Sequence, residues 1–156
     1  MLAQCDDLIV VIGSAEESHT VRNPFTAGER FQMVISSLTK EERSRVFIVP
    51  IRDVNRYSVW VGHIESYLPP FDIVYSNSRL TQSLFRQAGY EVKRTKAYNP
   101  KSYSATEIRR RIIHGEKWTD LVPDAVARLV EGMDGKERLL AAGADPGKKR
   151  GRKDVC

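Results

Sequence analysis

Short apolar runs alternate along the chain with segments whose apolar residues recur at helical spacing. Five consecutive apolar residues, Leu8 to Ile12, predict a strand that is buried on both faces, as in the middle of a parallel sheet. Further strands are predicted at 46–49, 72–75 and 90–94. Because helical patterns separate these strands, we expect an α/β fold with a parallel sheet and helices on both of its faces.

Hydroxyl residues followed by Glu three positions later mark two helix starts. Thr26 precedes Glu29, and Ser104 precedes Glu107, so each pair predicts a capping box. The helical patterns predict helices at 27–38, 59–68, 80–88, 105–114 and 123–133. The polar segment 14–25, between the first strand and the first helix, is long for a loop of such a fold, which favours a functional role.

Length and composition predict one domain over residues 1–140 of the 156-residue chain. No apolar stretch approaches the length of about 20 residues that a membrane-spanning helix needs, so no membrane association is expected. Cys5 and Cys156 lie near opposite ends of the sequence, without the spacing of metal ligands or of a disulfide framework. A reducing, cytoplasmic location is therefore expected.

Much of the formal net charge of +5 comes from the C-terminal end. Residues 145–156 hold five Lys and Arg residues against two Asp residues. This segment is rich in Gly and poor in apolar residues, so 141–156 is predicted to be a disordered basic tail. A solvated terminus is favoured over a nucleic-acid-binding arm, which makes nucleic acid an unfavoured partner.

The segment that carries the most chemistry begins at Ser104. A helix N-terminus presents unpaired backbone N–H groups and the positive end of the helix dipole, so it binds anions. The hydroxyls of Ser104 and Thr106 can add donors, and the guanidinium groups of Arg109 and Arg110 follow within the first two turns. The alternative is an ordinary capped helix with a solvated basic face, and composition does not separate the two.

Ser104, Thr106 and Arg109 together form a Ser-x-Thr-x-x-Arg sequence, which resembles the signature of the nucleotidyltransferase superfamily. Four further stretches are similar to the archaeal-type nicotinamide-nucleotide adenylyltransferases: 12–20, 23–30, 69–76 and 115–123. The similarity runs from about residue 1 to residue 140. It implies a Rossmann-like three-layer fold.

The resemblance also implies a reaction: the transfer of AMP from ATP to nicotinamide mononucleotide (NMN), which gives NAD and pyrophosphate. Ser104, Thr106 and Arg109, with Arg110 beside them, would then bind ATP, and Arg109 would be the catalytic residue. The implied cofactor is Mg²⁺ bridging phosphate oxygens, and few protein ligands are needed for it. The sequence predicts no protein metal site, since His19 has no partner ligands.

Three residues would contact NMN on the same resemblance. Arg30 would face a nucleotide phosphate, Trp60 the nicotinamide ring, and Asp53 would contribute from just beyond the end of a strand, where ligands collect in open α/β sheets. Each has a plain structural alternative: a surface arginine, a core tryptophan and a turn-forming aspartate.

The sequence departs from the family pattern in two places. Family members begin with a strand and a His-x-Gly-His motif, and His19, His63 and His114 do not form that motif. We therefore expect the sheet to lack its first strand, either because the recorded sequence starts at an internal methionine or because the chain is shortened. A form extended upstream is expected to be more stable and far more active. Asn77-Ser78-Arg79 replaces the family's Gly-Asn-Pro, which weakens any expected contact from that loop.

These departures keep other functions open at this point. The chain could be a nucleotide-binding module with impaired catalysis, or an adenylyltransferase for a flavin or pantetheine phosphate. A nucleic-acid-binding protein that uses its basic tail is the third alternative. Assembly into a homo-oligomer is left open, since relatives often assemble.

Overall fold

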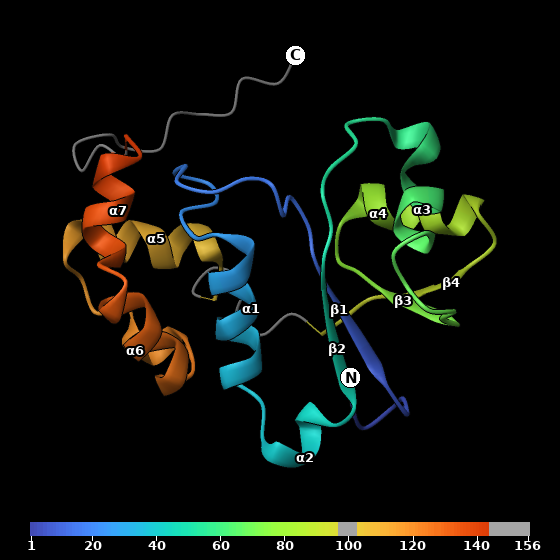
Figure 1. The fold of residues 1–156 in the computed structure, drawn as a ribbon, viewed down its shortest axis with the longest axis horizontal. Helices are drawn as coiled ribbons and strands as arrows, with labels where there is room; N and C mark the ends of the chain where they lie inside the picture. The colour runs from blue at the N-terminus through green and yellow to red at the C-terminus, as the bar shows by residue number, and fades with distance from the viewer. Residues whose placement is uncertain (97–102, 144–156) are drawn as a thin grey trace.

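Strands and helices alternate along the first two thirds of the chain and are followed by a group of helices (Figure 1). A computed structural model describes residues 1–96 and 103–143. The elements are β1 (Leu8–Ile12), α1 (Ala27–Ser36), α2 (Lys40–Arg43), β2 (Val46–Pro50), α3 (Tyr57–Glu65), β3 (Ile73–Tyr75), α4 (Arg79–Gln87), β4 (Glu91–Lys93), α5 (Ala105–His114), a 3-10 helix (Thr119–Leu121), α6 (Asp124–Gly132) and α7 (Gly135–Ala141).

All strand pairing is parallel, which gives the chain a Rossmann-like α/β fold. β1 pairs with β2 in the register Leu8↔Val46 to Ile12↔Pro50, and β3 pairs with β4 from Ile73↔Glu91 to Tyr75↔Lys93. The predicted single sheet is divided into these two pairs within the described residues. As in other open parallel sheets, β1 and β2 end side by side, and the loops that follow them start at one edge.

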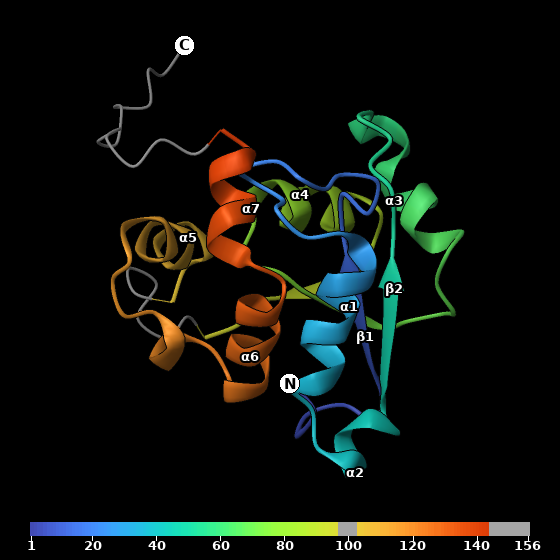
Figure 2. The same ribbon diagram turned by 60° about the vertical axis from the view of Figure 1, so that its left-hand side comes forward.

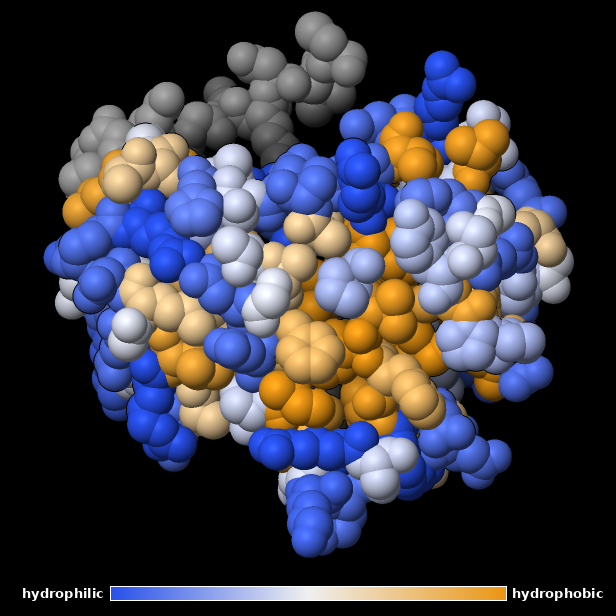
Figure 3. Space-filling model, in the orientation of Figure 1, coloured by the Kyte–Doolittle hydropathy of each residue, from blue (hydrophilic) through white to orange (hydrophobic). Residues whose placement is uncertain are grey.

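The prediction that Leu8 to Ile12 is buried on both faces was wrong. Ile12 is the only buried residue of β1, and Val11 is 39% exposed. The physical reason is that, within the described part of the chain, β1 has a neighbouring strand on one edge only. Figure 3 shows apolar side chains gathered at the centre of the face where Figure 1 draws β1, β2 and α1.

Two apolar clusters hold the helices in place. Ile51, Ile64 and Phe85 form one cluster, under α3 and α4. Ile112, Val130 and Leu139 form the second, which joins α5, α6 and α7. Both ribbon views place α5, α6 and α7 together (Figures 1 and 2), and Figure 1 draws them on the side of α1 away from β3 and β4. α5 is therefore held in place by the second cluster.

The predicted helix boundaries agree closely with the structure where a cap fixes them. Thr26 forms the predicted capping box with Glu29, and Gly115 ends α5 in the left-handed conformation with φ of 68°. At Ser104 only half of the predicted box forms, because the Glu107 carboxylate pairs with arginines instead.

Two helices were not predicted. α2 was missed although Thr39 and Glu42 form a second capping box, a pattern that the sequence does show. α7 follows Asp134, a left-handed residue that separates it from α6. None of the helices within residues 1–96 and 103–143 has the length and apolarity to cross a membrane. The predicted basic tail lies outside the described residues, apart from 141–143.

Leu139 is fully buried in the second cluster, whereas its neighbour Leu140 is 38% exposed. We expect Leu139→Ala to lower the free energy of unfolding by about 2–5 kcal/mol, because it leaves a cavity under α5. Leu140→Ala is the matched control and should cost less than about 1 kcal/mol. Chemical denaturation measures both, and equal losses would show that this cluster does not stabilise the fold.

Candidate functional site

The first turn of α5 places a set of anion-binding groups at one helix end. Ser104 is the N-cap, and its hydroxyl accepts a hydrogen bond from the Glu107 N–H at 3.2 Å. Thr106 lies in the same turn and is exposed. The other N–H groups of this turn point toward the region beyond the helix start, as they do in any α-helix.

Three arginines follow, and one carboxylate divides them. Glu107 accepts hydrogen bonds from Arg110 at 2.9 and 3.0 Å and from Arg111 at 3.1 Å. Glu116 takes the other side of the Arg110 guanidinium at 2.5 and 2.6 Å. Residues three and four positions after Glu107 face it on a helix, whereas Arg109, two positions after it, points elsewhere.

Of these three arginines, Arg109 is the one that neither Glu107 nor Glu116 pairs with. In residues 1–96 and 103–143 it has no hydrogen bond and no ion pair, although it is partly buried. Burial and the nearby charge of Arg22 lower the pKa of Arg109, whereas the two carboxylates raise the pKa of Arg110. The structure therefore distinguishes the two predicted ATP-binding arginines: Arg109 is available to an anion, and Arg110 is already paired.

Arg30, predicted to face a nucleotide phosphate, binds the polar loop 13–26. Its guanidinium donates to the carbonyl oxygens of Gly13 and Ser14, each at 2.8 Å, and to that of Glu17 at 3.3 Å. Its Nε lies 3.4 Å from the Thr26 carbonyl oxygen in the first turn of α1. The side chain thus ties the start of the loop to the start of α1. Its contact with a phosphate stays a prediction.

Asp53 lies where β1 and β2 end together. The Ser14 hydroxyl donates to its carboxylate at 2.5 Å, and the Asp53 N–H donates to both carboxylate oxygens of Glu16 at 3.0 and 3.1 Å. Ser14 therefore connects Arg30 and Asp53. The Ser14 carbonyl oxygen accepts a hydrogen bond from Arg30, and the Ser14 hydroxyl donates one to Asp53. We did not predict Ser14 and Glu16 as site residues, although the length of the loop that holds them was the signal.

Trp60 lies on α3 and packs in the first apolar cluster. Its ring meets Phe85 edge to face, with centroids 5.6 Å apart, and the cluster also contains Ile51 and Ile64. This is the core position that the sequence offered as the alternative to a ligand contact. A role against the nicotinamide ring stays a prediction.

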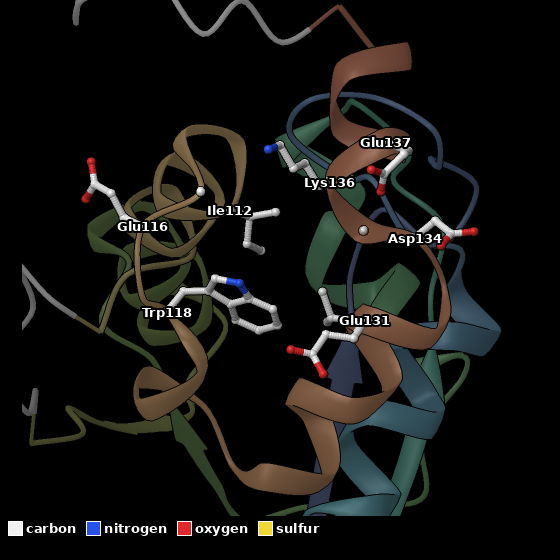
Figure 4. A pocket seen from close by; sticks show the side chains of 10 residues that line it. Ile112, Glu116, Trp118, Glu131, Asp134, Lys136 and Glu137 are labelled. Atoms are coloured by element: carbon white, nitrogen blue, oxygen red, sulfur yellow. The ribbon is translucent and has the colours of Figure 1, made fainter.

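A pocket of about 290 Å³ opens at the other end of α5 (Figure 4). Ile112, Trp118 and Val130 line it, and Glu131 and Glu137 carry carboxylates at its rim. None of the predicted ATP or NMN residues lines it. The carboxylates of this pocket would repel a polyphosphate, and the pocket lies at the opposite end of α5 from Ser104. We therefore place the candidate site at the start of α5.

Glu107 should control the pH dependence of α5. The hydrogen bonds from Arg110 and then Arg111 lower the pKa of Glu107 from 4.5 to about 2. A depressed carboxyl pKa stabilises the fold above the unfolded-state pKa, and this contribution is lost as pH falls from about 4.5 to about 2. Glu107→Gln should lower the melting temperature at pH 7, and the difference from the original chain should shrink toward pH 2. A difference that is constant with pH would contradict this assignment.

Arg30 should order loop 13–26 without any nucleotide. Lysine keeps the charge but cannot reach several carbonyl oxygens with one planar group. Arg30→Lys should therefore speed amide hydrogen exchange across residues 14–17 in the nucleotide-free protein. The control is Arg86→Lys, which changes an exposed arginine on α4. Unchanged exchange in Arg30→Lys would show that its bonds to the loop are not what orders it.

Comparisons with known proteins identify the family of this chain. The sequence model of the cytidylyltransferase-like family matches residues 1–111, which include α5 through Arg111. A nicotinamide-nucleotide adenylyltransferase from Archaeoglobus fulgidus is 45% identical over 89% of this chain and 83% of its own length. One from Methanosarcina mazei is 49% identical over 87% of this chain and 78% of its own length.

A solved structure supports the fold. It is a bifunctional NMN adenylyltransferase/ADP ribose pyrophosphatase from Francisella tularensis, complexed with AMP and a manganese ion. It covers 91% of this chain with a TM-score of 0.68 and 19% sequence identity, and the match spans 45% of its own chain. The archaeal relatives, at more than twice that identity, decide the family. The chain belongs to the cytidylyltransferase-like family and, within it, to the nicotinamide-nucleotide adenylyltransferases.

Proposed function

We propose that this chain transfers the adenylyl group of ATP to NMN, giving NAD and pyrophosphate. The observation that carries the proposal is the unpaired guanidinium of Arg109 within the first two turns of α5, the helix that Ser104 caps. The similarity to archaeal nicotinamide-nucleotide adenylyltransferases supports the choice of substrates. No observation in the structure favours a flavin or pantetheine phosphate as the acceptor.

The chemistry needs no nucleophile from the protein. An oxygen of the NMN 5′-phosphate attacks the α-phosphorus of ATP and forms the new P–O bond. The bond from that phosphorus to the oxygen bridging to the β-phosphate breaks, and pyrophosphate leaves with the electron pair. Catalysis then comes from holding the two phosphates in line and from neutralising the charge that grows on the leaving group.

The start of α5 is suited to the leaving group. Backbone N–H groups, the hydroxyls of Ser104 and Thr106, and the charge of Arg109 can all face the triphosphate oxygens. Arg110 remains a predicted ATP contact, but it must first release Glu116 to make one. We therefore assign Arg110 to bracing α5 and Arg109 to binding phosphate.

Mg²⁺ is proposed to arrive with ATP, as part of that substrate. In the described ranges, 1–96 and 103–143, no three His, Cys, Asp or Glu residues lie together in a way that could hold a metal ion. Mg²⁺ is commonly held by substrate phosphates and water with few protein ligands. An ion that binds as part of MgATP would therefore need no ligand cluster from the protein. When bound, the ion supplies charge neutralisation on the phosphate oxygens.

The NMN side is proposed to lie at the ends of β1 and β2. Asp53 and Ser14 present oxygen atoms there, suited to hydroxyl groups of a ribose. Arg30 would act by holding the loop that carries Ser14, and its predicted phosphate contact would use the same guanidinium. Trp60 packs against Phe85 in the core, so any contact with a nicotinamide ring would come from the part of its side chain that this packing leaves uncovered. A cytoplasmic location remains the expectation from the sequence.

Arg109→Ala tests the proposal. It should lower kcat/KM for NAD formation by about 10²–10³-fold, because a donor that stabilises developing charge is worth about 2.7–4 kcal/mol. The measurement is a coupled assay of NAD formation with MgATP and NMN. Arg128→Ala, which removes an exposed arginine from α6, is the control and should leave the rate within twofold. The same rate for Arg109→Ala would exclude the phosphate site proposed for α5.

A further inference from the structure

α7 (Gly135–Ala141) contacts both halves of the candidate site, although it carries no residue predicted to bind a substrate. Its buried Leu139 belongs to the same apolar cluster as Ile112 of α5. Arg138 of the same helix reaches the place where loop 13–26 meets α1. Figures 1 and 2 both draw this loop extending toward α7. One short helix therefore links the helix proposed to bind ATP with the loop proposed to bind NMN.

Arg138 makes two contacts with the end of the loop. Its Nη1 donates to both carboxylate oxygens of Glu29, at 2.8 and 2.7 Å. The guanidinium carbon of Arg138 lies over the Phe25 ring, 5.6 Å from the ring centre, which is within the range of a cation–π contact. The side chains of Arg138 and Glu29 are each 22% exposed, so water and salt screen this pair less than a pair on the surface. A single guanidinium thus holds the last residues of the loop and the first turn of α1.

Glu29 passes the contact from Arg138 to the backbone at the loop end. Its carboxylate accepts a hydrogen bond from the Thr26 N–H at 2.8 Å, and the Thr26 hydroxyl accepts one from the Glu29 N–H at 3.2 Å. Burial raises the pKa of Glu29, but hydrogen bonds from Arg138 and Thr26 outweigh this effect and lower the pKa overall. The carboxylate is therefore charged at neutral pH, and removal of Arg138 would leave a partly buried charge with one partner fewer.

Gly135 allows α7 to lie close to the loop. A Cβ atom at this position would lie 2.6 Å from Cγ1 and 2.9 Å from the carbonyl oxygen of Val130, and 3.5 Å from Cζ of Phe25. The start of α7 thus approaches α6 and Phe25 more closely than a larger residue would permit. Phe25 is held between the α7 backbone, the Arg138 guanidinium and the apolar cluster.

The other end of the loop is fixed from the residue next to Glu29. Arg30 donates to the Gly13 and Ser14 carbonyl oxygens, so the first two turns of α1 tie the loop at its start and connect it to α7 at its end. Transfer in line requires that both substrates be held at fixed positions. We propose that Arg138 is a positioning residue for adenylyl transfer, which fixes the loop that carries Ser14 relative to α5. This assignment rests on the proposed function and places Arg138 against neither substrate.

Arg138→Met tests the positioning role, because it keeps an unbranched side chain but removes the guanidinium. It should lower kcat for NAD formation by about tenfold to 10²-fold, since a displacement of about 1 Å can cost about 10²-fold. MgATP alone should bind Arg138→Met as tightly as the unchanged chain, because no group proposed to bind ATP has changed. Arg138→Lys should recover part of kcat, because it keeps the charge opposite Glu29 but loses the planar contact with Phe25.

The measurements are the coupled assay of NAD formation and isothermal titration calorimetry with MgATP, at a temperature at which every variant is folded. Val46→Ala is the control for a loss of stability alone. Val46 is buried at the start of β2, where it pairs with Leu8, at the other end of these strands from Ser14. This control should lower the melting temperature and keep kcat within twofold. The same result for Arg138→Met, a lower melting temperature with unchanged kcat, would show a merely structural role and exclude the proposal.

Amide hydrogen exchange in the nucleotide-free protein separates failure of this proposal from failure of the proposed function. Arg138→Met should speed exchange at the Thr26 and Glu29 N–H groups, which the capping box protects. Unchanged exchange there would overturn the anchoring by Arg138, whether or not NAD is formed. If the unchanged chain forms no NAD from ATP and NMN, the proposed function fails. If it forms NAD and Arg138→Met has the same kcat, the positioning role is excluded and the proposed function stands.

Discussion

The candidate site depends on the way a single carboxylate divides three consecutive arginines. Glu107 faces the residues three and four positions later on α5, so it neutralises Arg110 and Arg111 and leaves Arg109 with its charge unpaired. A carboxylate one position earlier or later would pair with a different arginine. Because Arg109 directly follows the first turn of α5, where backbone N–H groups are unpaired, its charge lies near the positive end of the helix dipole. That combination allows a mildly basic chain to present a focused site for phosphate.

The second half of the site is built around the loop that follows β1. Ser14 has a positive φ of 48°, which is uncommon for a residue other than glycine, and both of its polar groups are in use. Its carbonyl accepts from Arg30 and its hydroxyl donates to Asp53, so these contacts offset the backbone cost. The arrangement holds the ends of β1 and β2 and the start of α1 at fixed positions relative to one another. Substrate groups would meet a surface that is already ordered.

Apolar packing fixes the position of the loop after β1 relative to the start of α5. The cluster of Ile112, Val130 and Leu139 receives Phe25 from the loop side and Ile108 from α5. The Arg138–Glu29 ion pair then links α7 to the first turn of α1. Both contacts join residues that are far apart in sequence, so the relation of α1 to α5 depends on α6 and α7 although neither carries a predicted site residue. Changes in this C-terminal cluster should therefore reach the site through position and not through chemistry.

The sequence by itself determined the local features of this protein. Periodicity and caps located most helices and strands, and the N-cap Ser104 with its arginines indicated a candidate site, because these features depend on neighbours within about one helical turn. Only the tertiary structure decided which charges are available. It showed that Arg110 is paired and Arg109 is not, and that Arg30 binds loop carbonyls. These contacts join segments that are distant in sequence. The pairing of β1 with β2 alone, which leaves Val11 exposed, is also a long-range feature. A long arginine side chain can reach many acceptors, and only the packing of the folded chain determines which of them lie within hydrogen-bonding distance. The sequence pattern therefore cannot predict these contacts.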